Sequence, residues 1–187
     1  GGKTAKELLA AENIFAAAEV GDVESIKKLL AGGAEVNGKN KGGYTALHLA
    51  AKRGQAAAAA ALLEAKADIS LASKSGKTAL HYVAYYNGNL DLAKALLDAG
   101  AAVNAKDGKN KTPLDYALSK KRTELAELLR SKGGKTTKEL AAAENIFAAA
   151  EVGDVESIKK LLAGDAEVNG KNKGGYTALH LAAKKGH

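Results

Sequence analysis

One stretch of the sequence indicates the fold class: Gly43-Tyr44-Thr45-Ala46-Leu47-His48-Leu49-Ala50-Ala51-Lys52-Arg53-Gly54. Its core, Thr-Ala-Leu-His at 45–48, recurs at 78–81, as Thr-Pro-Leu-Asp at 112–115, and again as Thr-Ala-Leu-His at 177–180. The first three copies are 33 and 34 residues apart. A period of this size is typical of solenoids, in which each unit buries its apolar face only by stacking on its neighbours.

A second, longer period contains the first. Residues 1–55 and 133–187 align without a gap at an offset of 132 and differ only at Ala5/Thr137, Leu9/Ala141, Gly33/Asp165, Arg53/Lys185 and Gln55/His187. We therefore expect one elongated array over 1–187, in which 1–132 form a four-repeat module and 133–187 begin a second, truncated copy. We expect the stack to continue across the join, with a hinge there as the alternative.

Local signals predict two short helices and a polar hairpin loop in each unit. Thr45 is expected to cap a first helix that runs to Arg53, and a second helix follows from Gln55 to about Ala65. Pro113 fits the first helical position after Thr112, where its missing N–H costs nothing. Second helices are expected to start after the N-caps Asp22 and Asn89. The pairs Thr4/Glu7 and Thr136/Glu139 fit capping boxes.

These residues resemble the ankyrin-repeat family. The stretch 43–51 followed by Gly54 is similar to the family's repeat signature, and Ala34-Glu35-Val36-Asn37 and Ala101-Ala102-Val103-Asn104 are similar to its hairpin motif. The chain departs from the family pattern at three places: Asn110 replaces the turn glycine, Asp115 replaces the histidine, and one extra residue lies between His81 and Gly88. The resemblance implies an all-α ankyrin-repeat solenoid of stacked helix-turn-helix pairs joined by hairpin loops.

Composition narrows the function classes. The chain has 46% hydrophobic residues but only 4% aromatics, and it contains no cysteine, which excludes disulfides, thiol nucleophiles and cysteine metal sites. No apolar run approaches the ~18 residues of a membrane span, and no signal peptide opens the chain. We therefore expect no membrane span and, by default, a cytoplasmic location. The net charge of +7 leaves acidic proteins, nucleic acids and anionic surfaces as partner classes.

No motif predicts catalysis, a cofactor or a metal site. Gly-Lys-Thr occurs at 76–78 and 134–136, but a phosphate-binding loop needs a glycine five residues earlier, where Leu71 and Leu129 stand. His48, His81 and His180 share one repeat position, so they lie on separate layers, too far apart to bind one metal. The resemblance implies that this histidine hydrogen-bonds locally and between loops.

The charge pattern suggests a binding surface. In ankyrin-like stacks the hairpin tips and the exposed side of the first helices form the concave face. Tyrosines interleave with basic residues at those positions, and Lys39, Lys120 and Lys171 share the pattern. We expect partner contacts from Lys41, Tyr44, Lys52, Arg53, Lys74, Lys77, Tyr85, Tyr86, Lys109, Lys111, Lys173, Tyr176, Lys184 and Lys185.

Three functions remain open from the sequence. The first is a non-catalytic scaffold that binds a protein partner, acidic by charge complementarity, on this face. The second is a structural array, natural or designed, that self-associates end to end, because the last unit lacks a second helix and should leave Leu179, Leu181 and Ala182 partly bare. The third is weak binding of nucleic acid or an anionic surface. Arginine, which usually binds phosphate through two hydrogen bonds, is scarce, and this argues against nucleic acid. The simplest alternative to any binding function is that the lysines merely keep the loops soluble.

The six alanines at 56–61 stand where other units place larger side chains. They fit either a close-packed, alanine-rich layer or a simplified sequence.

Overall fold

The computed structural model describes residues 13–142, 145–164 and 166–187, and the described residues form helices and loops without strands. Contacts divide the chain into two compact units, with the boundary in the sequence between Gly134 and Lys135. The expected capping box at Thr4 and Glu7 lies outside the described residues. Continuous stacking across the join stays a prediction.

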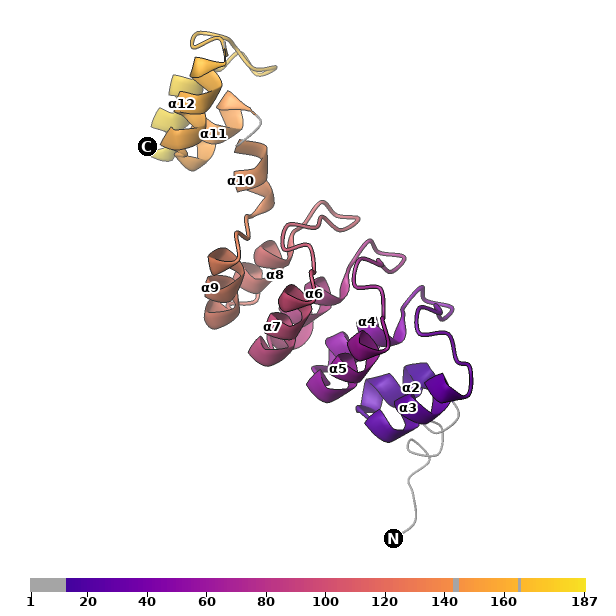
Figure 1. The fold of residues 1–187 in the computed structure, drawn as a ribbon. Coiled ribbons are helices and arrows are strands. Elements are labelled where there is room, and N and C mark those ends of the chain that lie inside the picture. Colours follow the sequence, from indigo (N-terminus) through magenta and orange to yellow (C-terminus); the bar gives the residue numbers. More distant parts are fainter. Residues whose placement is uncertain (1–12, 143–144, 165) are drawn as a thin grey trace. The chain divides into compact units, whose positions relative to one another are not determined.

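The first unit consists of helix pairs that follow one another in chain order, with hairpin loops projecting on one side (Figure 1). Each pair has a first and a second helix. The pairs are α2 (Ile14–Val20) with α3 (Val23–Ala31), α4 (Ala46–Arg53) with α5 (Ala56–Glu64), α6 (Ala79–Tyr82) and η1 (Val83–Asn87) with α7 (Leu90–Asp98), and α8 (Pro113–Ser119) with α9 (Thr123–Ser131).

The second unit repeats the start of this pattern. It contains α10 (Thr137–Ala142), α11 (Ile146–Val152), α12 (Val155–Ala163) and α13 (Ala178–Lys185). Helix α10 packs against α11, and α11 packs against both α12 and α13. Thr136 and Glu139 form the expected capping box, since each side chain accepts the backbone N–H of the other residue.

The predicted caps start the helices where expected. Thr45 accepts the backbone N–H of His48, Asp22 that of Ser25, and Asn89 that of Leu92. Pro113 occupies the first turn of α8. Each cap satisfies an N–H group that the helix itself leaves without a partner, so these boundaries follow from local sequence.

The core of the first unit runs from layer to layer through alanine and leucine. Leu47, Leu62, Leu80, Leu96 and Leu114 are at most 2% exposed. Three of the six alanines in α5 are also buried (Ala58, Ala59, Ala61), and this helix packs between α3 and α7. The alanines therefore form part of the core layer, whatever the reason for their run in the sequence.

The bare surface expected on the last helix is only partly correct. Leu179 is 78% exposed, as expected, and Ala182 is half-buried, but Leu181 is only 7% exposed, so its expected exposure is wrong. Residues two apart on an α-helix point to nearly opposite sides. Leu181 lies on the side of α13 that packs against α11, whereas Leu179 lies on the side away from it.

Candidate functional site

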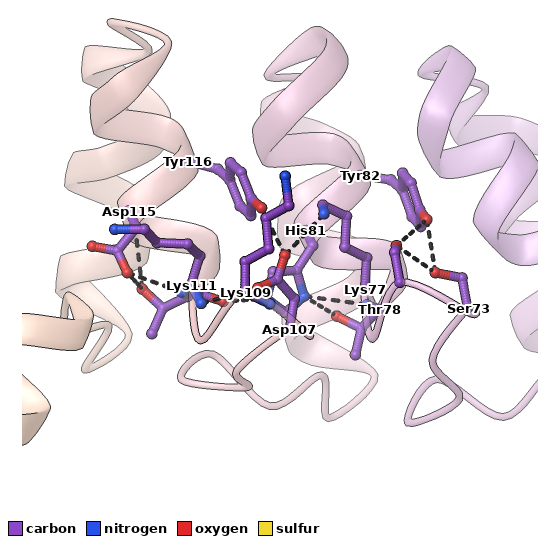
Figure 2. A network of polar contacts seen from close by, with 12 residues as sticks. Ser73, Lys77, Thr78, His81, Tyr82, Asp107, Lys109, Lys111, Asp115 and Tyr116 are labelled. Atoms are coloured by element: carbon purple, nitrogen blue, oxygen red, sulfur yellow. Dashed lines mark hydrogen bonds and ion pairs between the residues drawn. The ribbon is translucent and has the colours of Figure 1, made fainter.

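The candidate site lies on the hairpin side of the first helices in the first unit. Tyr82 and Tyr116 occupy the same repeat position, one residue after His81 and Asp115, and both reach back to the hairpin that precedes their helix (Figure 2). The Tyr116 hydroxyl donates to Oδ2 of Asp107 at 2.6 Å, and the Tyr82 hydroxyl shares a hydrogen bond with Oγ of Ser73 at 2.8 Å. Both rings are thereby fixed against the hairpins.

Asp107 organises the hairpin that precedes α8. Its Oδ1 accepts the backbone N–H groups of Lys109 and Lys111 at 2.9 and 3.0 Å. Its Oδ2 lies 2.9 Å from the ammonium of Lys77, which comes from the preceding hairpin (Figure 2). The side chains of both ions are largely withdrawn from water, at 13% exposure for Lys77 and none for Asp107. One carboxylate therefore closes a turn, anchors a tyrosine and joins two repeats.

This network shifts the pKa values of its members. Burial by itself would raise the pKa of Asp107, but the hydrogen bonds from Lys77, Tyr116 and the turn outweigh burial and hold it well below its ordinary value. Burial would likewise lower the pKa of Lys77, and the contacts with Asp107 and Tyr116 raise it instead. Burial and the neighbouring carboxylate raise the pKa of Tyr116. The ion pair thus stays charged across the physiological range.

Two histidines join successive hairpins. Nδ1 of His48 accepts the backbone N–H of Thr45 at 3.0 Å, so Nε2 carries the proton and donates to the carbonyl oxygen of Leu71, also at 3.0 Å. His81 repeats this arrangement with Thr78 and the carbonyl of Lys111. Burial lowers the pKa of His48 to about 4, and burial lowers that of His81 as well. The expected local and inter-loop hydrogen bonds are confirmed for both.

Five tyrosine rings gather over these hairpins. Tyr82 stacks on Tyr86 with centroids 6.1 Å apart, and Tyr85 meets Tyr86 and Tyr116 edge to face at 4.8 and 5.3 Å. Tyr44 joins the group through Tyr82 at 5.5 Å. Together with the lysines around them, these rings form what we call the tyrosine–lysine face, which comprises Tyr44, Lys52, Lys77, Tyr82, Tyr85, Tyr86, Lys109, Lys111, Tyr116 and Lys120.

The lysines of this face lie over the ring faces. The ammonium of Lys52 is 5.5 Å from the centroid of Tyr44 and 5.3 Å from that of Tyr86. Lys120 lies 4.3 Å from the centroid of Tyr85. These are cation–π distances, so the rings hold ammonium groups that would otherwise swing freely in water.

The structure brings together about half of the residues expected to bind a partner. Seven of them belong to the tyrosine–lysine face: Tyr44, Lys52, Lys77, Tyr85, Tyr86, Lys109 and Lys111. The side chain of Arg53 is instead ion-paired with Glu19 of the preceding repeat, and Lys74 donates to the carbonyl of Lys41 at 2.7 Å. Lys39 donates to the carbonyl of Ala72 in the same way. These cations therefore also hold adjacent repeats together.

The remaining expected residues lie in the second unit. Lys184 sits 5.7 Å from the ring centroid of Tyr176, as Lys52 does for Tyr44 in the first unit. Lys173 and Lys185 are exposed. Tyr176 is 47% exposed and contacts the ring of His180.

Three residues of the site were not predicted from the sequence: Tyr82, Tyr116 and Asp107. A signal was available, because Tyr82 and Tyr116 stand in the column that holds Leu49 and Leu181 in other repeats, and Asp107 aligns with Asn40 and Asn172. Reading each repeat column for a change from apolar to hydroxyl-bearing residues would have found both tyrosines. The pairing of Asp107 with Lys77 depends on how two hairpins approach one another.

A metal site is absent from the described ranges. Within them no three His, Cys, Asp or Glu side chains are grouped to hold a metal ion. None of the helices described is both long and apolar enough to cross a bilayer.

Comparisons with known proteins agree with this architecture. Models of ankyrin repeats match residues 14–107 and 62–139 (three copies) and 146–187 (many copies). The chain is 30% identical over 167 residues to a transient receptor potential cation channel subfamily A member 1 homolog of Caenorhabditis elegans, covering 89% of this chain and 14% of that protein. It is 32% identical over 169 residues to an L-asparaginase of Dirofilaria immitis, covering 90% of this chain and 23% of that protein.

The chain therefore spans less than a quarter of either relative, and their names describe a cation channel homolog and an L-asparaginase. Ankyrin repeats are in general not catalytic and serve to bind other proteins. The family models cover most of the chain, and its helix pairs, hairpins and histidine bridges have the geometry that the repeat signature implies. This protein belongs to the ankyrin-repeat family.

Proposed function

We propose that this chain is a non-catalytic interaction module that binds an acidic segment of a partner protein on its tyrosine–lysine face. The observation that carries the proposal is the placement of lysine ammonium groups over tyrosine rings, at Lys52 and Lys120 in particular. An acidic partner is the occupant that this arrangement favours most.

Ordering explains why these lysines favour binding. A free lysine loses rotamer freedom when it pairs with a carboxylate, which offsets much of the gain from a surface ion pair. Lys52 and Lys120 are already restrained by the rings, so part of that entropy is lost before the partner arrives. Pre-ordered cations therefore bind a carboxylate more tightly than solvated ones.

The sign of the surface points the same way. The ring faces of Tyr44, Tyr85 and Tyr86 are occupied by the chain's own cations, which leaves little attraction for a cationic partner. The carboxylate of Asp107, which anchors Tyr116 of the same face, is buried and engaged with Lys77. The exposed potential is therefore positive, which steers acidic groups toward the face.

The same details argue against single-stranded nucleic acid. Such sites use separated aromatic platforms on which bases stack, often with arginine beside them. Here the tyrosines pack against each other. The guanidinium group of Arg53 is paired with Glu19. That of Arg122 donates to the carbonyls of Ala84 and Tyr85. Nucleic acid thus ranks below an acidic peptide.

Selection from a phage-displayed library of random dodecapeptides tests the proposal. Panning on the purified chain near physiological salt should enrich Asp and Glu. The triple variant Lys52→Gln, Lys109→Gln, Lys111→Gln should bind the selected peptides about tenfold or more weakly, since three partner ion pairs of about 0.5–1 kcal/mol each are lost. The matched control is Lys27→Gln, Lys28→Gln, Lys94→Gln, which removes the same charge from exposed positions on second helices. Equal losses in both variants, or no acidic enrichment, would contradict the proposal.

A second candidate, end-to-end self-association, is favoured by the 78% exposure of Leu179. Its counterpart Leu47, on a helix that differs only at Arg53/Lys185, is 2% exposed, and that helix packs on α6 of the next repeat. Light scattering over a dilution series tests this candidate, because self-association makes the mass grow with concentration. The variant Leu179→Asp should abolish that growth. A constant mass of 19.1 kDa would exclude self-association over the range measured.

A further inference from the structure

The first helix of the third repeat contains a turn of π-helix. In α4 and α13 eight residues separate the capping threonine from the terminal glycine, whereas nine residues, Ala79 to Asn87, stand between Thr78 and Gly88. The extra residue is accommodated in η1, and the N–H of Gly88 donates to the carbonyl of Val83 five residues earlier, at 2.8 Å. Such turns are rare and occur often at functional sites.

Neighbouring repeats stabilise this irregular turn. Arg122, at the start of α9, donates from Nε to the carbonyl of Ala84 at 3.1 Å and from Nη2 to that of Tyr85 at 3.2 Å. On the other side, Asn87 donates to the carbonyl of Ala51 at 2.8 Å. The carbonyls that a π-turn frees from regular helix pairing thus have partners, so the turn is a fixed part of the fold.

The wide turn brings two consecutive tyrosines to one pocket. Successive side chains on an α-helix diverge by about 100°, and a helix with more residues per turn reduces that angle. Ala84 remains buried in the core, while Tyr85 and Tyr86 after it both line a single pocket of about 340 Å³. The tyrosine–lysine face supplies most of the remaining wall, including Tyr44, Tyr82 and Tyr116.

The pocket is lined by tyrosine rings and by lysines. The hydroxyl of Tyr116 is bound to Asp107, and that of Tyr82 to Ser73 and Ser75, so these polar ends are already satisfied inside the chain. Lys109 and Lys111, both exposed, line the hairpin side. A volume at the low end of the ~300–1,000 Å³ range of ligand sites fits one large side chain better than a whole cofactor.

We infer that this π-turn pocket takes one aromatic side chain of the partner, flanked in the partner's sequence by carboxylates that reach Lys109 and Lys111. The inference rests on the proposed function, because it assigns an anchor within the same face. Aromatic rings offer edge-to-face contacts to Tyr85 and Tyr86, and the flanking carboxylates meet the positive rim. Tyr86, at 47%, is the most exposed tyrosine of the pocket.

Fluorescence anisotropy with two labelled peptides tests the inference. Both are dodecapeptides of Asp, Glu and Gly; one carries a central tryptophan and the other a central alanine. We expect the tryptophan peptide to bind at least about tenfold more tightly, as a buried aromatic anchor does. Equal affinity of the two peptides would overturn the anchor and leave the acidic-partner proposal standing. No binding of either peptide would contradict both.

Variants place the effect at the pocket. Tyr86→Ala, at an exposed position, should remove the advantage of tryptophan without loss of helicity. Deleting Tyr85, which restores the eight-residue spacing, should do the same. Tyr176→Ala is the matched control, because Tyr176 holds Lys184 as Tyr44 holds Lys52 but lies in the second unit. A tryptophan advantage that survives Tyr86→Ala overturns the inference, even where the deletion variant does not fold. Tighter binding of an oligothymidylate than of the tryptophan peptide overturns it too.

Discussion

The ammonium nitrogen of Lys77 lies 2.9 Å from Oδ2 of Asp107, so a buried ion pair joins the hairpins of two successive repeats. The same carboxylate accepts the Tyr116 hydroxyl and two backbone N–H groups of its own turn. Replacing either ion leaves the other buried without its counterion, and Asp107 also holds one wall of the tyrosine cluster in place.

Asp107→Ala should therefore be strongly destabilising. We expect a loss of about 3 kcal/mol in the free energy of unfolding, since removing one partner leaves the charge of Lys77 uncompensated. Urea denaturation followed by circular dichroism measures it. The control is Asp98→Ala, whose ion pair with Lys132 is largely exposed and should contribute at most about 1 kcal/mol. Equal losses would show that the buried pair has no special role.

The bridging histidines predict a loss of stability in mild acid. The folded chain holds His48 neutral, with its pKa lowered to about 4, whereas an unfolded histidine titrates near ~6.5. The unfolded state therefore takes up protons first as pH falls. The contribution of His48 to the free energy of unfolding is fully present above pH ~6.5. It declines as the pH falls toward ~4, by about 3 kcal/mol in all. His81 acts in the same direction.

Glutamine at these positions tests that prediction, because it can still complete the capping box but does not titrate. The double variant His48→Gln, His81→Gln should flatten the dependence of unfolding free energy on pH in this window. His180→Gln, at an exposed copy of the same position, should leave it unchanged. A double variant as acid-sensitive as the parent would assign the effect to other groups.

Leu47 and Leu179 occupy the same position in identical local sequence but differ in burial, so the same substitution at each measures the effect of burial on stability. Leu47→Ala should cost about 3 kcal/mol, because Leu47 is only 2% exposed and its removal leaves a cavity. Leu179→Ala, at the equivalent position but 78% exposed, should change stability by no more than about 0.5 kcal/mol. Hydrogen exchange assigns each loss to its own unit. Similar costs at both sites would mean that the Leu179 side chain is covered in solution.

Two glycines test how closely the hairpins approach. Gly76 has a φ of 74°, and a Cβ there would lie 2.4 Å from the backbone nitrogen of Gly108 in the next hairpin. Gly100 has a φ of 94° but open space around it. Both alanine variants carry the left-handed penalty of about 1–2 kcal/mol. Gly76→Ala should therefore lower the melting temperature clearly more than Gly100→Ala, and equal shifts would contradict the close contact.

Much of the fold could be predicted from local sequence. The caps at Thr45, Asp22 and Asn89 depend on a side chain and an N–H group three residues away. The fixed repeat period indicates that each helix pair stacks on the next. The candidate face was predicted in outline for the same reason, since Tyr44, Lys52, Tyr85 and Tyr86 occupy recurring positions. The exposure of Leu181 could not be predicted in this way, because one side of α13 packs against α11 and the other does not.

The sequence by itself determined the repeat, its helix boundaries and the histidine column, because these depend on contacts within one unit or on a strictly repeated spacing. Only the tertiary structure decided which side of the last helix is covered, so that Leu181 is buried and Leu179 is not. It alone joined Lys77 to Asp107 and gathered five tyrosines from three repeats around one π-turn. Burial and inter-repeat contacts depend on two adjacent repeats at once. The residues of a single repeat do not specify which neighbour will pack against them.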